Sequence, residues 1–152
     1  MAGSIMHTIL IQNIHLVNEG VITETDVLIE NQSIKKIGKI IPDSSTTIID
    51  GTGKYLLPGI IDGQVHFREP GLTHKGDLYS ESRAAVAGGV TSFIDMPNTL
   101  PNVLSLDLLN EKYQLAGQKS LANFGFFLGV TAENLEEIIQ LDTSSLLAVS
   151  DD

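Results

Sequence analysis

The second part of the chain alternates short apolar runs with segments of helical periodicity, and this alternation restricts the fold more than any other feature. Continuous apolar runs predict strands over residues 59–62, 90–96, 123–130 and 145–150. Residues 75–89, 105–117 and 131–141 between them read as helices, the first two ending at glycines. Strands that are apolar on both faces and alternate with helices are typical of a parallel sheet covered by helices.

The first third of the chain has a different pattern. Runs rich in Ile and Val over residues 7–17, 21–30 and 34–41 are separated by turn-forming residues. We interpret these runs as antiparallel strands, followed by one more strand and a Gly-rich turn within residues 46–59. The sequence therefore predicts an N-terminal β portion, residues 1–56, and an α/β portion, residues 57–152.

The α/β portion is too short to form a complete, closed barrel. Four strands and three helices make about half of a closed (β/α)8 barrel, which takes about 250 residues. The chain has 152 residues and stops at a strand end, which would leave an apolar edge exposed. We therefore expect a partial (β/α)8 barrel with about its first four β/α units. The alternative is an open, complete sheet, but the exposed edge favours the front of a longer protein.

Composition argues against several classes of function. Nine Lys and Arg residues against 19 Asp and Glu give a net charge of −10, so nucleic-acid binding is not expected. No apolar run is long enough to cross a bilayer, and without cysteine there is neither a disulfide framework nor a thiolate metal site. These features fit a cytoplasmic protein. An anionic substrate would need a local basic group to overcome the overall charge.

Polar side chains follow three of the four predicted strands. The segment DGQVHFR, residues 62–68, follows the first strand, Asp95-Met96-Pro97-Asn98 follows the second, and Asp151-Asp152 follows the fourth. In a parallel barrel the active site lies at the carboxyl ends of the strands. The convergence of these three segments on one rim predicts a functional site there.

Each of these residues also has a simpler interpretation. His66 suits zinc as a neutral imidazole, but a lone histidine is more often satisfied by backbone hydrogen bonds. The guanidinium of Arg68 can fork onto a substrate carboxylate, or it can form a salt bridge with Glu69 or Asp95. The spacing alone does not separate these interpretations.

The other two strand ends leave similar alternatives. Asn98 can donate its amide to the same anion, or it can form a turn beside Pro97. Asp151 and Asp152 can supply a carboxylate that bridges metal ions, or they can be a solvated chain end. No residue is identified as catalytic.

At these positions the chain resembles the dihydroorotases of the cyclic amidohydrolase superfamily. The similar runs are GKYLLPGIIDGQVHFREPGLTHKGDL, SRAAVAGGVTSFIDMPNTLP and GVTAENLEEI, and the N-terminal run DVLIENQSIKKIG adds to them. Allantoinases and hydantoinases share the EPG and AAVAGG runs but usually lack the residues found here as Arg68 and Asn98. Those two residues favour the dihydroorotase type, and the allantoinase or hydantoinase type is an alternative.

The resemblance implies a (β/α)8 barrel with a small β-sandwich built from both chain ends. It implies one or two zinc ions at the rim and the reversible interconversion of carbamoyl aspartate and dihydroorotate in pyrimidine biosynthesis. By the same resemblance, His66 is a metal ligand, and Arg68 and Asn98 bind the carboxylate of this small anionic substrate.

Two departures from the family pattern bear on the metal. The family has Asp-x-His-x-His-x-Arg, and Gln64 stands at the first histidine, where it offers only a weak neutral oxygen. The bridging group is either a carboxylated lysine, whose position is held by Ser150, or an aspartate of a Thr-Asp-Asp-Gly run; we prefer Asp151 or Asp152.

These departures lead to the expectations for function. Later histidine ligands and the family's catalytic aspartate are absent, so we expect weak or absent zinc binding and no activity from the isolated chain. The substitution at Gln64 also favours a second hypothesis, a non-catalytic dihydroorotase homologue that serves as a structural partner of aspartate transcarbamoylase. A homo-oligomer is a further possibility.

Overall fold

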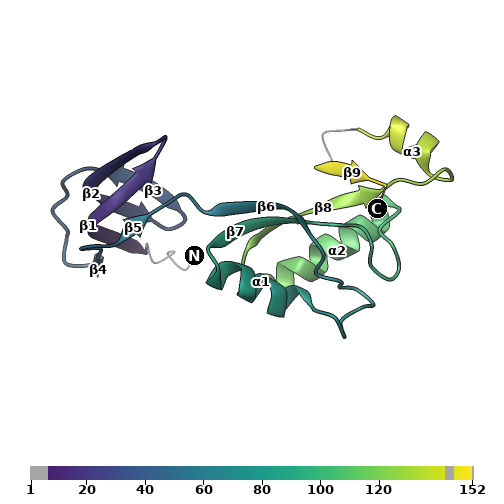
Figure 1. The fold of residues 1–152 in the computed structure, drawn as a ribbon, viewed down its shortest axis with the longest axis horizontal. Helices are drawn as coiled ribbons and strands as arrows, with labels where there is room; N and C mark the ends of the chain where they lie inside the picture. The colour runs from purple at the N-terminus through teal and green to yellow at the C-terminus, as the bar shows by residue number, and fades with distance from the viewer. Residues whose placement is uncertain (1–6, 143–145, 152) are drawn as a thin grey trace, which may run out of the picture. The chain divides into compact units, whose positions relative to one another are not determined.

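The computed structural model describes residues 7–142 and 146–151. The chain divides into two compact units, Met1–Pro58 and Gly59–Asp152, both drawn in Figure 1. No helix among the described residues is long and apolar enough to cross a membrane.

A five-stranded sheet forms the first unit. Its order is β3-β2-β1-β4, and β5 also pairs with β1. The first three strands are antiparallel, as expected, whereas β4 and β5 run parallel to β1. Residues 46–59 thus contain two short strands instead of the single one predicted. The bounds are β1 Thr8–Asn18, β2 Val21–Glu30, β3 Ser33–Ile37, β4 Thr47–Asp50 and β5 Tyr55–Leu56.

The third strand is shorter than predicted, and a buried carboxylate explains the difference. The predicted run reached residue 41, but β3 ends at Ile37 and Gly38 follows with φ +136°. The Asp26 carboxylate accepts the backbone N–H of Ile40 at 3.2 Å and that of Asn13 at 3.0 Å. These hydrogen bonds draw the chain after Gly38 away from the sheet ladder, a contact that hydrophobic periodicity cannot reveal.

The second unit contains the predicted parallel sheet with helices. Its strands follow the order β6-β7-β8-β9, all parallel, and Figure 1 shows the sheet curled over α2. The expected fold class, a partial (β/α)8 barrel with an N-terminal β segment, is confirmed. The strands are β6 Ile60–Val65, β7 Val90–Asp95, β8 Asn123–Gly129 and β9 Ala148–Ser150, and the helices are α1 Leu78–Ala87, α2 Leu106–Lys119 and α3 Leu135–Gln140.

Three helix boundaries differ from those predicted. Helix α1 begins at Leu78 instead of residue 75, because the Asp77 side chain caps it by accepting the Ser80 N–H. Helix α2 does not stop at Gly117 but continues to Lys119, because Ala116 is fully buried and its carbonyl accepts the Ser120 N–H at 2.8 Å. Helix α3 begins at Leu135 instead of residue 131. The Asn134 side chain accepts the Thr131 N–H at 2.7 Å and donates to the Gly129 carbonyl at 2.9 Å, which holds residues 131–134 in a turn.

Two strand boundaries also change. Strand β6 continues to Val65, three residues beyond the predicted end, so that Asp62 and Gln64 lie inside the strand. Strand β9 begins at Ala148, and the start of the predicted strand at residue 145 lies outside the described residues.

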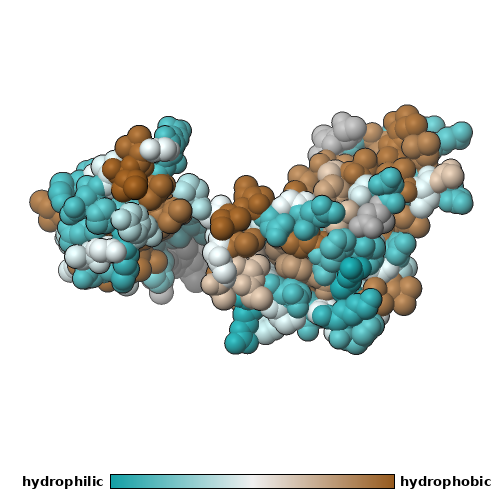
Figure 2. All heavy atoms as spheres, viewed as in Figure 1, coloured by the Kyte–Doolittle hydropathy of each residue, from teal (hydrophilic) through white to brown (hydrophobic). Residues whose placement is uncertain are grey.

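Aromatic side chains build the core between the sheet and α2. Phe93 and Phe126 are almost completely buried, and Tyr113 of α2 packs edge-on against Phe126 with ring centroids 4.9 Å apart. Phe67, which follows β6, packs against Phe93 at 4.4 Å and so belongs to the same cluster. Hydrophobic side chains also reach the surface over β6 and around α3 and β9 (Figure 2).

Candidate functional site

The structure brings together three residues that the sequence places after two different strands. His66 is the first residue after β6, and Asn98 lies three residues after the end of β7. The His66 Nδ1 atom is 3.0 Å from Asn98 Oδ1, and Arg68 Nη1 donates to the Asn98 backbone carbonyl at 3.4 Å. Because an amide oxygen only accepts, this contact is a hydrogen bond when the imidazole carries a hydrogen on Nδ1.

The backbone around Arg68 is held in an uncommon conformation. Arg68 has φ +68°, in the left-handed region that side chains other than glycine seldom adopt. Both neighbours of Arg68 are anchored: the Phe67 N–H donates to Asp95 Oδ1 at 2.9 Å, and the Glu69 carboxylate accepts the Leu78 N–H at 2.8 Å. Such conformations persist when the surrounding structure determines them, and they are common at functional sites.

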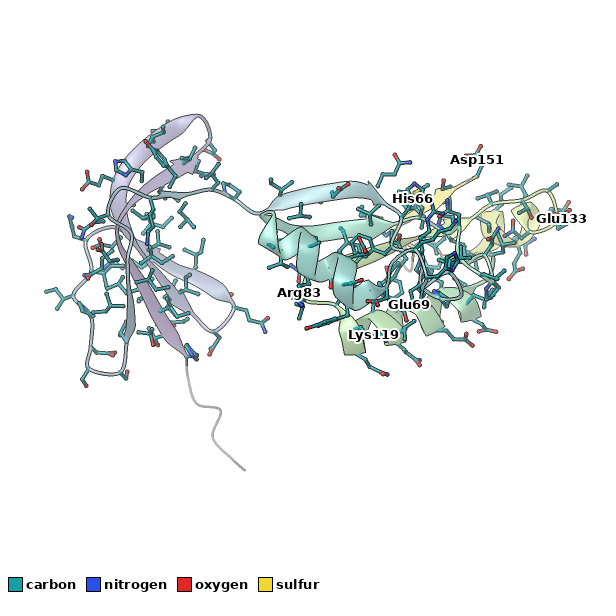
Figure 3. The ribbon with its side chains drawn as sticks, turned by 60° about the horizontal axis from the view of Figure 1, so that its bottom comes forward. His66, Glu69, Arg83, Lys119, Glu133 and Asp151 are labelled. Atoms are coloured by element: carbon teal, nitrogen blue, oxygen red, sulfur yellow. The ribbon has the colours of Figure 1, made fainter. Side chains whose placement is uncertain are left out.

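The two salt bridges considered for Arg68 are not formed. Asp95 faces Lys112 of α2 instead, with 2.8 Å between the carboxylate Oδ2 and Nζ, and both side chains are 1% exposed. Glu69 pairs with Lys119 at the end of α2, and Figure 3 shows these two side chains together. The anions beside Arg68 thus have other cations as partners, and the guanidinium lies against Asn98.

Lys112 is the residue that sequence reasoning missed. Burial lowers the pKa of its ammonium group, and the neighbouring Asp95 carboxylate opposes that shift. Its Nζ also donates to the Met96 carbonyl at 3.0 Å and lies 4.8 Å from the centre of the Phe126 ring. The available signal was its place on the apolar face of α2, one turn from Leu108 and from Ala116.

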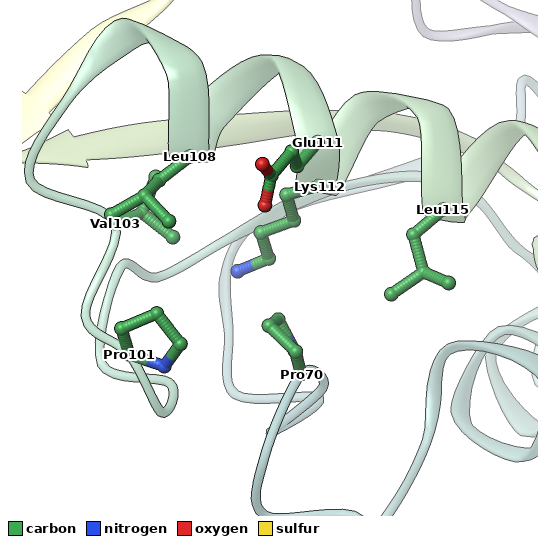
Figure 4. Close-up of a pocket in the computed structure, with 7 residues that line it drawn as sticks. All are labelled: Pro70, Pro101, Val103, Leu108, Glu111, Lys112 and Leu115. Carbon is green, nitrogen blue, oxygen red and sulfur yellow. The ribbon is translucent and has the colours of Figure 1, made fainter.

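The loops after β6 and β7 also touch each other further along. The Leu100 N–H donates to the Pro70 carbonyl at 3.1 Å. Gly71 has φ +81°, and a β-carbon there would collide with the Leu100 backbone. The glycine of the EPG run is therefore required by a close approach between the two loops. A cavity of about 290 Å³ lies between these loops and α2, lined by Pro70, Pro101 and Lys112 among others (Figure 4).

The predicted metal ligands do not form a complete site among the described residues. Asp62 accepts the Gln64 backbone N–H at 3.1 Å, and both residues lie inside β6 instead of after it. Asp151 follows β9, toward the same end of the sheet as His66 (Figure 3), and Asp152 lies outside the described residues. Over residues 7–142 and 146–151, no three His, Asp or Glu side chains gather to hold a metal ion.

Comparisons with known proteins agree with the sequence resemblance, although no family model matches the chain. It is 42% identical to the dihydroorotase of Methanosarcina acetivorans over 90% of its own length and 29% of that protein's. It is 40% identical to the dihydroorotase of Trichlorobacter lovleyi, over 89% and 33% of the two lengths. It is also 34% identical to an allantoinase of Desulfitobacterium hafniense, over 89% and 30%.

Among solved structures, the chain is similar to hydantoinases. The L-hydantoinase (dihydropyrimidinase) of Arthrobacter aurescens matches with a TM-score of 0.85 and 30% identity, over 95% of this chain and 32% of the hydantoinase. The expected resemblance to dihydroorotases is confirmed. The chain spans about a third of the length of the relatives it matches.

Proposed function

Because this chain is related to dihydroorotases and other cyclic amidohydrolases, we propose that it forms part of a dihydroorotase-like site that binds carbamoyl aspartate and dihydroorotate. The observation that carries the proposal is the meeting of His66, Arg68 and Asn98 at the ends of β6 and β7. Arg68 and Asn98 are also the residues by which the sequence resembles dihydroorotases more than hydantoinases. The interconversion of carbamoyl aspartate and dihydroorotate is a reaction of pyrimidine biosynthesis.

The proposed role of Arg68 and Asn98 is to bind the substrate carboxylate. Arg68 Nη1 is engaged by the Asn98 carbonyl, and the guanidinium has five N–H donors in a planar fork that matches a carboxylate. In a chain with net charge −10, such a local cation is needed to attract an anion. The hydrogen bond from Arg68 to the Asn98 backbone keeps the two residues adjacent.

Zinc is the cofactor that the family resemblance implies, and this chain's described donors do not hold it alone. Gln64 supplies only a neutral oxygen where the family has an imidazole, and within residues 7–142 and 146–151 three ligand side chains do not come together. We therefore assign the chain substrate binding and orientation. Further ligands and the general base would come from the part of the relatives that this chain does not span.

The isolated chain is expected not to hydrolyse dihydroorotate. The reason is that the described residues bring together no full ligand set, which activation of a water molecule by a metal ion requires. The measurement is zinc-supplemented turnover by the purified chain beside the variant Gln64→Ala/His66→Ala. Zinc-dependent turnover by the wild type alone would contradict this expectation.

A second proposal has a specific observation in its favour. The substitution at Gln64 and the incomplete ligand set also fit a non-catalytic homologue that acts as a structural partner of aspartate transcarbamoylase. A non-catalytic homologue would not need Arg68 to bind a substrate carboxylate. Binding of carbamoyl aspartate therefore separates the two proposals.

The binding proposal predicts that ligand affinity depends on the carboxylates. Carbamoyl aspartate should bind the chain at least about tenfold more tightly than its dimethyl ester, because hydrogen bonds to a charged group contribute about 1.5–3 kcal/mol. Calorimetric titration of both ligands measures this difference. Equal affinities for the acid and the ester, or no binding of the acid, would favour the non-catalytic homologue.

Because Gln64 stands where the dihydroorotase pattern has its first histidine, we expect Gln64→His to raise zinc affinity. Gln64 lies in the last residues of β6 and His66 follows the strand directly, two residues on, which is the spacing at which extended residues share a face. Even groups that only support a ligand change metal affinity about 10- to 100-fold, so a new imidazole should raise it at least about tenfold. A zinc titration beside Gln32→His, at a turn of the first unit, provides the control. Equal zinc affinity in wild type and Gln64→His would show that this strand is not aligned with the metal motif.

A further inference from the structure

A buried ion pair joins the two loops that carry the proposed binding residues. Asp95 ends β7, and its Oδ1 accepts the N–H of Phe67, which lies between His66 and Arg68. Its Oδ2 faces Lys112 Nζ at 2.8 Å and has no hydrogen-bond partner besides this ion pair among the residues that the structure describes.

Lys112 extends the same connection to the second loop. Its Nζ donates to the carbonyl of Met96, two residues before Asn98, at 3.0 Å. One ammonium group on α2 therefore fixes Asp95, and through it the loop after β6, and also fixes the loop after β7. Figure 4 shows the Lys112 side chain reaching from α2 toward these loops.

Stability alone is a poor explanation for this pair. Removing two charges from water costs more than their attraction returns in many proteins, and apolar replacements of a buried pair are often neutral or stabilising. What an apolar pair would not supply is the hydrogen bond to the Phe67 N–H and the one to the Met96 carbonyl. These two bonds attach the ion pair to the loops that carry His66, Arg68 and Asn98.

We propose that Lys112 and Asp95 are positioning residues, which hold the loops after β6 and β7 so that His66, Arg68 and Asn98 meet. The proposal rests on the proposed function for the ligand that these three residues bind. It does not require Lys112 or Asp95 to touch that ligand. Its direct consequence is structural: the contact between His66 Nδ1 and Asn98 Oδ1 depends on a pair buried behind the loops.

The test uses side-chain nitrogen NMR on the 152-residue chain without ligand. In the wild type, His66 should be the tautomer with hydrogen on Nδ1. Asp95→Leu/Lys112→Met replaces the pair with apolar residues and should convert His66 to a tautomer mixture and shift the Asn98 side-chain amide signal. The conservative variant Asp95→Asn retains an acceptor for the Phe67 N–H and should keep the wild-type tautomer.

Retention of the Nδ1 tautomer and of the Asn98 signal in Asp95→Leu/Lys112→Met would overturn the proposal. If that variant does not fold, hydrogen exchange on the wild type decides. The Phe67 amide should then be as protected as the amides of β7, and exchange at the rate of an exposed loop would overturn the proposal as well.

Carbamoyl aspartate gives the second measurement. Misplaced binding groups reduce affinity strongly, so Asp95→Leu/Lys112→Met should bind it roughly tenfold or more weakly than Asp95→Asn does. Equal affinities would overturn the positioning role while leaving the proposed function intact. Absence of binding by the wild type would reject the proposed function, and the His66 tautomer would still decide the positioning role.

Discussion

Lys112→Met should lower the free energy of unfolding by about 3–5 kcal/mol, the cost of removing one partner of a buried ion pair. The variant leaves the Asp95 carboxylate buried with no counter-ion and removes the donor to the Met96 carbonyl. Methionine has a similar length, so loss of packing is a minor contribution. Urea denaturation followed by circular dichroism measures the difference.

The matched control for this prediction is Lys35→Met. Lys35 pairs with Glu30 at 3.3 Å, but its side chain is 63% exposed, and an exposed pair contributes about 0–1 kcal/mol. A loss below about 1 kcal/mol for Lys112→Met would mean that Asp95 finds another partner or takes up a proton at little cost. The proposed positioning by Lys112 would then lose its energetic basis.

The fold could be predicted in outline because hydrophobic periodicity reports which faces are buried. All four strands of the parallel sheet and its three helices were predicted, as were the first three N-terminal strands, but only one of the two short strands β4 and β5 was expected. The boundaries failed where a side chain binds the backbone. Asn134 holds a turn where a helix was expected, and Asp26 diverts the chain after Gly38.

The candidate site was predicted in part. Positions after parallel strands correctly indicated that the segments of His66 and Asn98 would meet. The sequence could not decide the partner of Arg68, because that depends on Lys112 and Lys119, which lie more than forty residues away on α2. Long-range ion pairs leave no periodic signal. A buried lysine on an apolar helix face was the one local indication.

Arg68→Met tests the central claim, that the loops after β6 and β7 form a carboxylate-binding site. Arg68 is held beside Asn98 and is not paired with Glu69 or Asp95, so its removal should affect ligand binding more than stability. The expected loss is about 1.5–3 kcal/mol of binding free energy for carbamoyl aspartate, the range for hydrogen bonds between charged groups. Asn98→Ala removes a neutral donor and should cost less.

The deciding measurement is calorimetric titration of carbamoyl aspartate into the wild type, Arg68→Met and Arg83→Met. Arg83 is the other arginine of the chain and lies exposed on α1, so its variant controls for the loss of one positive charge. The account predicts that affinity falls roughly 10- to 100-fold for Arg68→Met and stays at the wild-type value for Arg83→Met. Equal affinities for all three proteins, or the same loss in both variants, would contradict the carboxylate-binding site.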